Sequence, residues 1–180
     1  MRSGRGSTVT PGPHAETGGR WRDHREVIDA IAFRFLAGVQ WVNLPEKYGN
    51  WKGVYNRLRM WAVDGTWERV FTALMAQADA DEDLDWAVSV DSTIVRAHQH
   101  AAGAHKQGAP AGEPADHAIG RSRGGLTTKI HLAADGHCRP LGLKQWRGVA
   151  TRYEKTATIY LAGLHIAGTF LWSARCRRSH

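Results

Sequence analysis

The chain contains 180 residues and carries a formal net charge of +7, from 24 Lys and Arg against 17 Asp and Glu. This length allows one ordinary domain or two small modules that share a core, and the positive balance indicates either a nucleic-acid partner or a soluble basic surface. The two cysteines, Cys138 and Cys176, are far apart and lack neighbouring ligands, which excludes a disulfide framework or a zinc site and favours a reducing cytoplasm.

A helical N-terminal module is predicted from residue 20. Residues 1–19 are basic without an apolar core, which excludes a secretory signal and predicts a disordered leader. Asp23 and Glu26 match a capping pair for a first helix that runs to Gly38. A proline-containing connector precedes a second helix, and Thr66 is expected to cap a third. The second and third helices place apolar residues on one face: Trp51, Val54, Tyr55, Leu58 and Trp61, then Trp67, Val70, Phe71 and Leu74.

An acidic, alanine-rich stretch, "AQADADEDLD", follows the third helix and is expected to mark a domain boundary. It separates a helical module at 20–80 from a second domain at 85–180. The net charge is −2 in residues 81–143, between +3 in residues 1–80 and +6 in residues 144–180. Basic ends therefore flank an acidic middle.

The run "WAVSVDSTIV" predicts a strand buried on both faces, because Val, Ile and Thr dominate it. Asp91 lies within this run. A buried carboxylate costs desolvation unless it accepts hydrogen bonds, joins an ion pair or binds a divalent cation such as Mg²⁺. Two-metal phosphoryl chemistry needs two or three convergent carboxylates, so Asp91 by itself leaves these alternatives open.

The thirty or so residues after this strand end in "GRSRGG" and lack helical or strand periodicity, so a loop is expected. Two short strands joined by a hairpin turn at Asp135-Gly136 should follow. Residues 149–172 should form one helix that buries its apolar groups on the sheet. The apolar run 157–172 is shorter than a membrane span and contains His165, which favours a buried helix over a membrane role.

Several side chains are candidate ligands for nucleic acid. Lys52, Arg57 and Arg59 on the second helix suit contacts to phosphates or base edges in a helix-turn-helix type bundle, although a helical docking or dimerisation module explains the pattern equally well. Arg121 and Arg123 and the glycines around them suit a phosphate, and equally a flexible connector. The histidines of the loop are irregularly spaced and are expected to be solvated rather than metal-bound: His98, His100, His105 and His117.

Long segments of the chain, in order and across most of residues 20–175, resemble bacterial insertion-sequence transposases. In that family two aspartates and a glutamate on a ribonuclease-H-like fold are catalytic. The run "RWRDHREVIDAIAFRFLAGVQWVNLP" and the residues after it resemble the family's N-terminal helical module, and "VSVDSTIVRAHQHAAGA" resembles its first catalytic strand. The run "GRSRGGLTTKIHLAADGHCRPL" resembles the family's next two strands, and "LKQWRGVATRYEKTATIYLAGLHIAGTFLW" resembles the family's C-terminus. The resemblance implies that Asp91 is the first catalytic aspartate and a ligand of Mg²⁺.

The same resemblance implies an internal deletion. The family's segments with the second aspartate and the glutamate have no counterpart, and the sequence passes from the third strand directly to "KQWRG" near residues 142–144. The connector reads "QWVNLP" where the family usually has "PWRDLP", so Val42 and Asn43 replace a charged pair. The other carboxylates beyond residue 96 do not occupy the family's catalytic contexts: Glu113, Asp116, Asp135 and Glu154.

We therefore expect an α+β protein, with an N-terminal helical bundle, a partial ribonuclease-H-like sheet of three strands and a C-terminal helix. An intact relative would cleave element ends and transfer strands with Mg²⁺. With Asp91 alone, this chain is expected to be inactive, or to act only beside intact transposase subunits. The alternatives are a non-catalytic DNA-binding remnant or regulator, and a decayed reading frame without function. The expected partner is double-stranded DNA at terminal inverted repeats, in the cytoplasm and away from any membrane.

Overall fold

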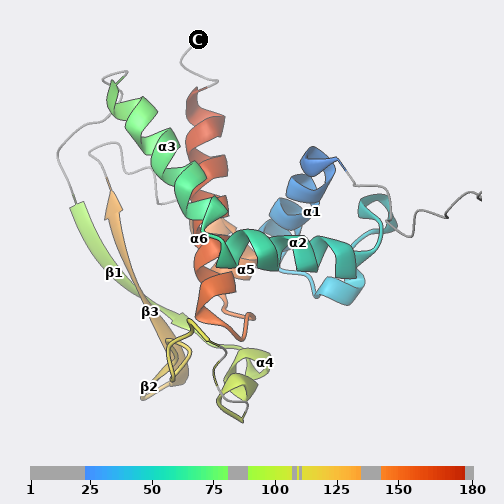
Figure 1. The fold of residues 1–180 in the computed structure, drawn as a ribbon. Coiled ribbons are helices and arrows are strands. Elements are labelled where there is room, and N and C mark those ends of the chain that lie inside the picture. The colour runs from blue at the N-terminus through green and yellow to red at the C-terminus, as the bar shows by residue number, and fades with distance from the viewer. Residues whose placement is uncertain (1–22, 81–88, 107–108, 110, 135–142, 177–180) are drawn as a thin grey trace, which may run out of the picture.

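The computed structural model describes residues 23–80, 89–106, 109, 111–134 and 143–176, and confirms the predicted α+β class. Helices from both ends of the chain surround α6, and a three-stranded sheet lies beside them (Figure 1). The helices are α1 (His24–Ala37), α2 (Trp51–Val63), α3 (Thr66–Ala80), α4 (Gln99–Ala102), α5 (Arg147–Ala150) and α6 (Ala157–Cys176), and the strands are β1 (Ser89–Arg96), β2 (Gly120–Ser122) and β3 (Gly125–Ala134). The expected domain boundary after residue 80 lies outside the described residues.

The ends of α1 are those that the sequence predicts. The Asp23 carboxylate accepts a hydrogen bond from the Arg25 N–H, which satisfies one of the unpaired amides of the first turn. Gly38 ends the helix in the left-handed conformation, with φ of 68°. A Cβ at this position would lie 2.8 Å from the Arg147 Cβ, so both the backbone angle and the close approach of α5 require glycine.

The connector between α1 and α2 folds into two 3₁₀ turns, Trp41–Asn43 and Glu46–Tyr48. Asn50 then caps α2 by accepting from the Lys52 N–H. Phe33 of α1 packs on Tyr48, and Trp41 packs edge-on against Tyr55, with ring centroids 5.2 and 5.3 Å apart. These contacts hold the connector against the helices.

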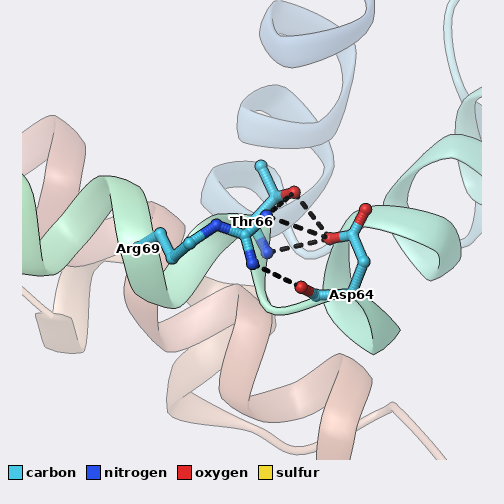
Figure 2. Close-up of polar contacts among 3 residues, drawn as sticks. All are labelled: Asp64, Thr66 and Arg69. Atoms are coloured by element: carbon cyan, nitrogen blue, oxygen red, sulfur yellow. Dashed lines mark hydrogen bonds and ion pairs between the residues drawn. The ribbon is translucent and has the colours of Figure 1, made fainter.

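A tight corner joins α2 to α3. The Asp64 carboxylate accepts hydrogen bonds from both the backbone N–H and the hydroxyl of Thr66, at 2.9 and 2.6 Å, and Arg69 closes the corner by donating to the Asp64 carbonyl (Figure 2). Thr66 was predicted to cap α3, but it is the first helical residue and Asp64 supplies the capping oxygen. The Asp64 carboxylate, two residues earlier, reaches the Thr66 amide, while the Thr66 hydroxyl donates to the same carboxylate.

The main core joins α6 to the three N-terminal helices. Ile31 and Phe35 of α1 and Ile166 and Ala167 of α6 are completely buried in one apolar cluster, and α3 lies along α6 (Figure 1). We expected α6 to bury its apolar groups on the sheet. The structure shows that only a smaller cluster does so, in which Tyr160 packs with Val95 and Ile130. A helix that is apolar around most of its circumference can pack on the N-terminal helices and on the sheet at the same time.

The sheet is antiparallel, with strand order β1-β3-β2 and Asp91 opposite Leu132. The prediction of a structureless loop before β3 was wrong at its end: Gly120–Ser122 forms β2, which pairs with the start of β3. A strand of three residues is too short to show a period, and the hairpin depends on Gly125, whose φ is +111°. Part of the same segment also forms α4. The predicted strand after Asp135-Gly136 lies outside the described residues.

The prediction of one continuous helix over 149–172 was also wrong. α5 ends at Ala150, and the chain stays non-helical until α6 begins at Ala157. The Arg152 N–H donates to the Arg96 carbonyl at 3.0 Å, and the His98 N–H donates to the Arg152 carbonyl at 2.8 Å. Pairing with the end of β1 therefore takes this segment out of the helical conformation.

No helix within the described part of the chain has both the length and the hydrophobicity required to span a bilayer.

Candidate nucleic-acid interface

One exposed face of α2 carries polar and basic side chains at helical spacing. Lys52, Asn56, Arg59 and Val63 follow one another at intervals of four, three and four residues, which places them on one side of the helix, and all four are exposed. The opposite side is buried: Val54 and Leu58 are at most 1% exposed. We call Lys52, Asn56, Arg59, Met60 and Val63 the α2 face.

The α2 face combines basic, amide and apolar side chains. Met60 and Val63 are 57% and 73% exposed, between and beside the polar side chains. Gly53, at the N-terminal end of this side of the helix, has no atom within 4 Å of the position of a Cβ, so a partner can approach the backbone there. Cations, an amide and apolar groups together match the donors and methyl contacts that read DNA grooves.

Arg57, predicted beside Arg59 as a DNA ligand, lies on another side of α2. Its Nη1 is 3.3 Å from the His24 Nε2, and its guanidinium carbon is 5.4 Å from the centre of the Trp61 ring. The structure therefore brings Lys52 and Arg59 together, but not Arg57. Sequence reasoning missed Asn56, although its position four residues after Lys52 was sufficient to place it on the same face.

Arg121 and Arg123, the second predicted pair of basic ligands, lie on β2 and in the β2–β3 turn, and both are exposed. The glycine-rich segment forms a hairpin in which the Ser122 hydroxyl donates to the Gly125 carbonyl. The Arg96 guanidinium approaches the same turn, 3.6 Å from the position of a Cβ on Gly124. These arginines lie at the sheet, apart from the α2 face.

Asp91, the predicted catalytic residue and metal ligand, lies in β1, and its side chain is outside the described atoms. The three other carboxylates described after residue 96 have structural partners. Glu113 accepts from the first backbone amides of α6, Asp116 accepts from the Ala118 N–H, and Glu154 pairs with Arg34. Within the side chains that the structure describes, no three His, Cys, Asp or Glu residues form a group that suits a metal ion.

The histidines of the segment after β1 have local contacts. His98 caps α4 by accepting from the His100 N–H, and its ring packs on the rings of His100 and Tyr153, with both centroids 4.8 Å away. His117 is buried and adopts a positive φ of 52°. The expectation that these histidines are solvated is therefore wrong for His117, which is only 3% exposed.

A buried arginine that the sequence did not single out ties the sheet to the helices. The Arg152 side chain is fully buried and donates to the carbonyls of His117 and Ala118 and to the Thr128 hydroxyl, at 2.7 to 3.0 Å. Burial lowers its pKa, and the surrounding acceptors keep the charged form satisfied. This contact fixes the sheet, with Asp91 on it, relative to α6.

Comparison with known proteins finds one family and two curated relatives that are similar to part of the chain. Residues 7–71 match the family described as "Putative transposase of IS4/5 family (DUF4096)". An uncharacterized protein, y4sN, of Sinorhizobium fredii (strain NBRC 101917 / NGR234) is 38% identical over 84 residues, which are 47% of this chain and 63% of that protein. An insertion element IS402 uncharacterized 16.2 kDa protein of Burkholderia cepacia is 34% identical over 77 residues, 41% of this chain and 52% of that protein.

The chain thus spans between half and two thirds of the length of these curated relatives. No solved structure matches it significantly. The family match covers α1, α2 and the beginning of α3, including every residue of the α2 face. Residues 7–71 are therefore similar to a family described as putative transposases, and part of the chain is similar to a protein of an insertion element.

Proposed function

We propose that this protein binds double-stranded DNA of an insertion sequence through the α2 face. The observation that carries the proposal is the alignment of Lys52, Asn56 and Arg59 on the exposed side of a helix within the region that matches a transposase family. The described residues of the face include no carboxylate, so nothing there repels phosphate. Lys and Arg bind phosphates, and Asn and Arg bind base edges in the major groove.

The local structure supports this use of α2. Asn50 caps the helix, the connector packs on its first turns, and the buried side chains of the opposite face hold it against α1 and α6. The helix therefore presents its polar side without rearrangement, which lowers the entropy lost on binding. Contact of Arg57, Arg121 and Arg123 with DNA stays a prediction.

Fluorescence anisotropy with a labelled DNA duplex tests the proposal on the full chain. The double variant Lys52→Ala, Arg59→Ala should bind more weakly, and its plot of log affinity against log salt should be less steep by about 2, because two phosphate contacts are lost. A matched control, Lys47→Ala with Lys144→Ala, removes the same charge at exposed positions outside the α2 face. No binding at low salt, or equal losses in the two double variants, would contradict the proposal.

We further propose that the chain binds DNA without cutting it. The resemblance assigns three carboxylates and Mg²⁺ to the reaction of the family, and this chain offers Asp91 alone in a matching context. Glu113, Asp116 and Glu154 are used for helix capping, a turn and an ion pair, which supports this proposal. The residues described do not make up a Mg²⁺ ligand set.

A nuclease assay on element-end DNA with Mg²⁺ or Mn²⁺ distinguishes a chain that binds DNA without cutting it from an active nuclease. Background cleavage is expected for the unmodified chain and for Asp91→Asn alike. Cleavage above background that Asp91→Asn abolishes would establish the alternative, an enzyme that completes its site in another way, for example with an intact transposase subunit. A non-cutting chain that still binds element ends would compete with intact transposase for them.

A further inference from the structure

One face of the sheet packs on α6, and the opposite face carries exposed side chains. Val95 of β1 and Ile130 of β3 are buried with Tyr160 of α6 in one apolar cluster. Successive residues of a strand lie on opposite sides of a sheet, so the positions that alternate with these two are on the face turned away from α6 (Figure 1). We call the following set, all of it exposed, the outer sheet face: Ser92, Ile94 and Arg96 of β1, and Lys129 and His131 of β3.

The outer sheet face carries positive charge that no described carboxylate balances. Lys129 lies opposite Ile94, and Arg96, two residues after Ile94, is the diagonal neighbour of Lys129 across the strands. The Arg96 guanidinium extends to the turn at Gly124, where Arg123 is also exposed. Among the residues that the structure describes, no acidic side chain forms an ion pair with any of these three cations.

This separation of charge does not follow from the composition of the segment. Residues 81–143 contain 6 basic and 8 acidic residues, yet the outer sheet face has cations only. Two of the acidic residues, Glu113 and Asp116, accept hydrogen bonds from backbone amides elsewhere in the fold. Opposite charges on neighbouring strands stabilise a sheet and like charges destabilise it, so an external anion would relieve the repulsion between the cations of this face.

We propose that the outer sheet face binds the sugar-phosphate backbone of double-stranded DNA, at a site separate from the α2 face. The choice of DNA as the anion rests on the proposed function. Arg96 and Lys129 suit phosphate oxygens, and the Ser92 hydroxyl, which shares a hydrogen bond of 2.8 Å with the His131 Nδ1, lies on the same face. The described residues of this face include no Phe, Tyr or Trp on which bases stack, so binding should not depend on base sequence.

A protein partner fits the outer sheet face less well than DNA does. The cores of protein interfaces are apolar and aromatic, whereas DNA-binding surfaces are polar and positively charged. Ile94, which is 62% exposed, is the single apolar residue among the five of this face. The competing partner is an acidic protein segment, such as the stretch "DADEDLD" of a second copy of this chain.

Fluorescence anisotropy of the full chain with two labelled duplexes of unrelated sequence tests the proposal. The double variant Arg96→Gln, Lys129→Gln should bind both duplexes about 5- to 30-fold more weakly at low salt, and its plot of log affinity against log salt should be less steep by about 2. Lys47→Gln with Lys144→Gln is the matched control, which removes the same charge at exposed positions elsewhere. Thermal unfolding verifies that the variants are folded, and Lys129→Glu by itself provides a second variant of this face.

Comparison with the variant Lys52→Ala, Arg59→Ala separates this site from the α2 face. Duplex binding that the sheet variants leave unchanged, or reduce no more than the control does, would overturn the proposal for the sheet while the α2 face stands. Binding that the sheet variants weaken and the α2 variant does not would overturn the proposed function of the α2 face instead. No duplex binding by the unmodified chain would overturn both.

Analytical ultracentrifugation without DNA tests the competing partner. If the outer sheet face bound the acidic stretch of a second copy, the unmodified chain would form a dimer that Arg96→Gln, Lys129→Gln dissociates, and this result would overturn the proposal. The expected result is that the two proteins have the same sedimentation coefficient and differ only in their affinity for DNA.

Discussion

Arg34 of α1 and Glu154 of the segment before α6 form an ion pair at 2.5 Å, and their side chains are only 4% and 7% exposed. Burial lowers the pKa of the Arg34 guanidinium, and the Glu154 carboxylate opposes this shift by favouring the charged form. The guanidinium also lies 5.1 Å from the centre of the Trp41 ring. One contact thus connects the N-terminal helices, the connector and the C-terminal segment.

Arg34→Met should destabilise the fold by about 3–5 kcal/mol, because it leaves the Glu154 carboxylate buried without its cation. Urea denaturation followed by circular dichroism gives the change in the free energy of unfolding. Arg59→Met is the matched control at an exposed position of α2 and should change stability by no more than about 0.5 kcal/mol. Similar losses in the two variants would show that the buried pair has no special role.

Gly163→Ala should also destabilise the fold, since a Cβ at this position of α6 would overlap the fully buried Phe35 ring. Overpacking of this kind costs about 1–3 kcal/mol. Gly53→Ala, at an open position of α2, should instead stabilise the helix by about 0.5–1 kcal/mol, because alanine is the better helix former. Thermal unfolding of both variants is the measurement, and a stabilised Gly163→Ala protein would mean that α1 and α6 are not tightly packed.

His165 should make stability depend on pH. Its ring stacks on Phe71 of α3, with centroids 5.7 Å apart, and burial lowers its pKa below the ordinary value of 6.5, against a weaker opposite influence of Glu68. The unfolded chain therefore takes up the proton first, so this contribution is complete above about pH 6.5 and is lost as the pH falls toward the folded-state pKa.

His165→Phe keeps an aromatic ring on Phe71 and removes the titration. Unfolding free energies measured between pH 5 and 7 should fall less steeply with decreasing pH in the variant, by at most about 1.4 kcal/mol per pH unit for one proton. Identical slopes in the two proteins would contradict burial of the imidazole between α3 and α6.

Hydrogen exchange should find α1 and the middle of α6 protected to a similar degree. Ile31 and Phe35 share one core with Ile166 and Ala167, so their helices should open together. β1 is at the edge of the described sheet and rests on a smaller apolar cluster, so its amides should exchange faster. Mass spectrometry of peptides from the full chain measures this exchange. If the amides of α6 exchanged as early as those of the sheet, α1 and α6 would not share one core.

The sequence by itself determined the local features of this protein. Asp23 and Gly38 mark the ends of α1 because capping and left-handed backbone are chemistry of single residues and their neighbours. The spacing of Trp51, Val54 and Leu58 predicted the buried side of α2, and thereby the exposed side that carries Lys52 and Arg59. The spacing of apolar residues is enough to predict the buried side of a helix that packs on the core through one face only.

Only the tertiary structure decided how the C-terminal segment is used. The expected helix is interrupted at Arg152, whose backbone pairs with the end of β1. Its side chain donates to His117, Ala118 and Thr128, which are also far away in the sequence. A cavity beside Arg34 likewise depends on α1, the connector and the segment before α6 meeting in space. Local propensity favoured a continuous helix there, but hydrogen bonds and burial with distant partners outweighed it, and such contacts have no period along the chain.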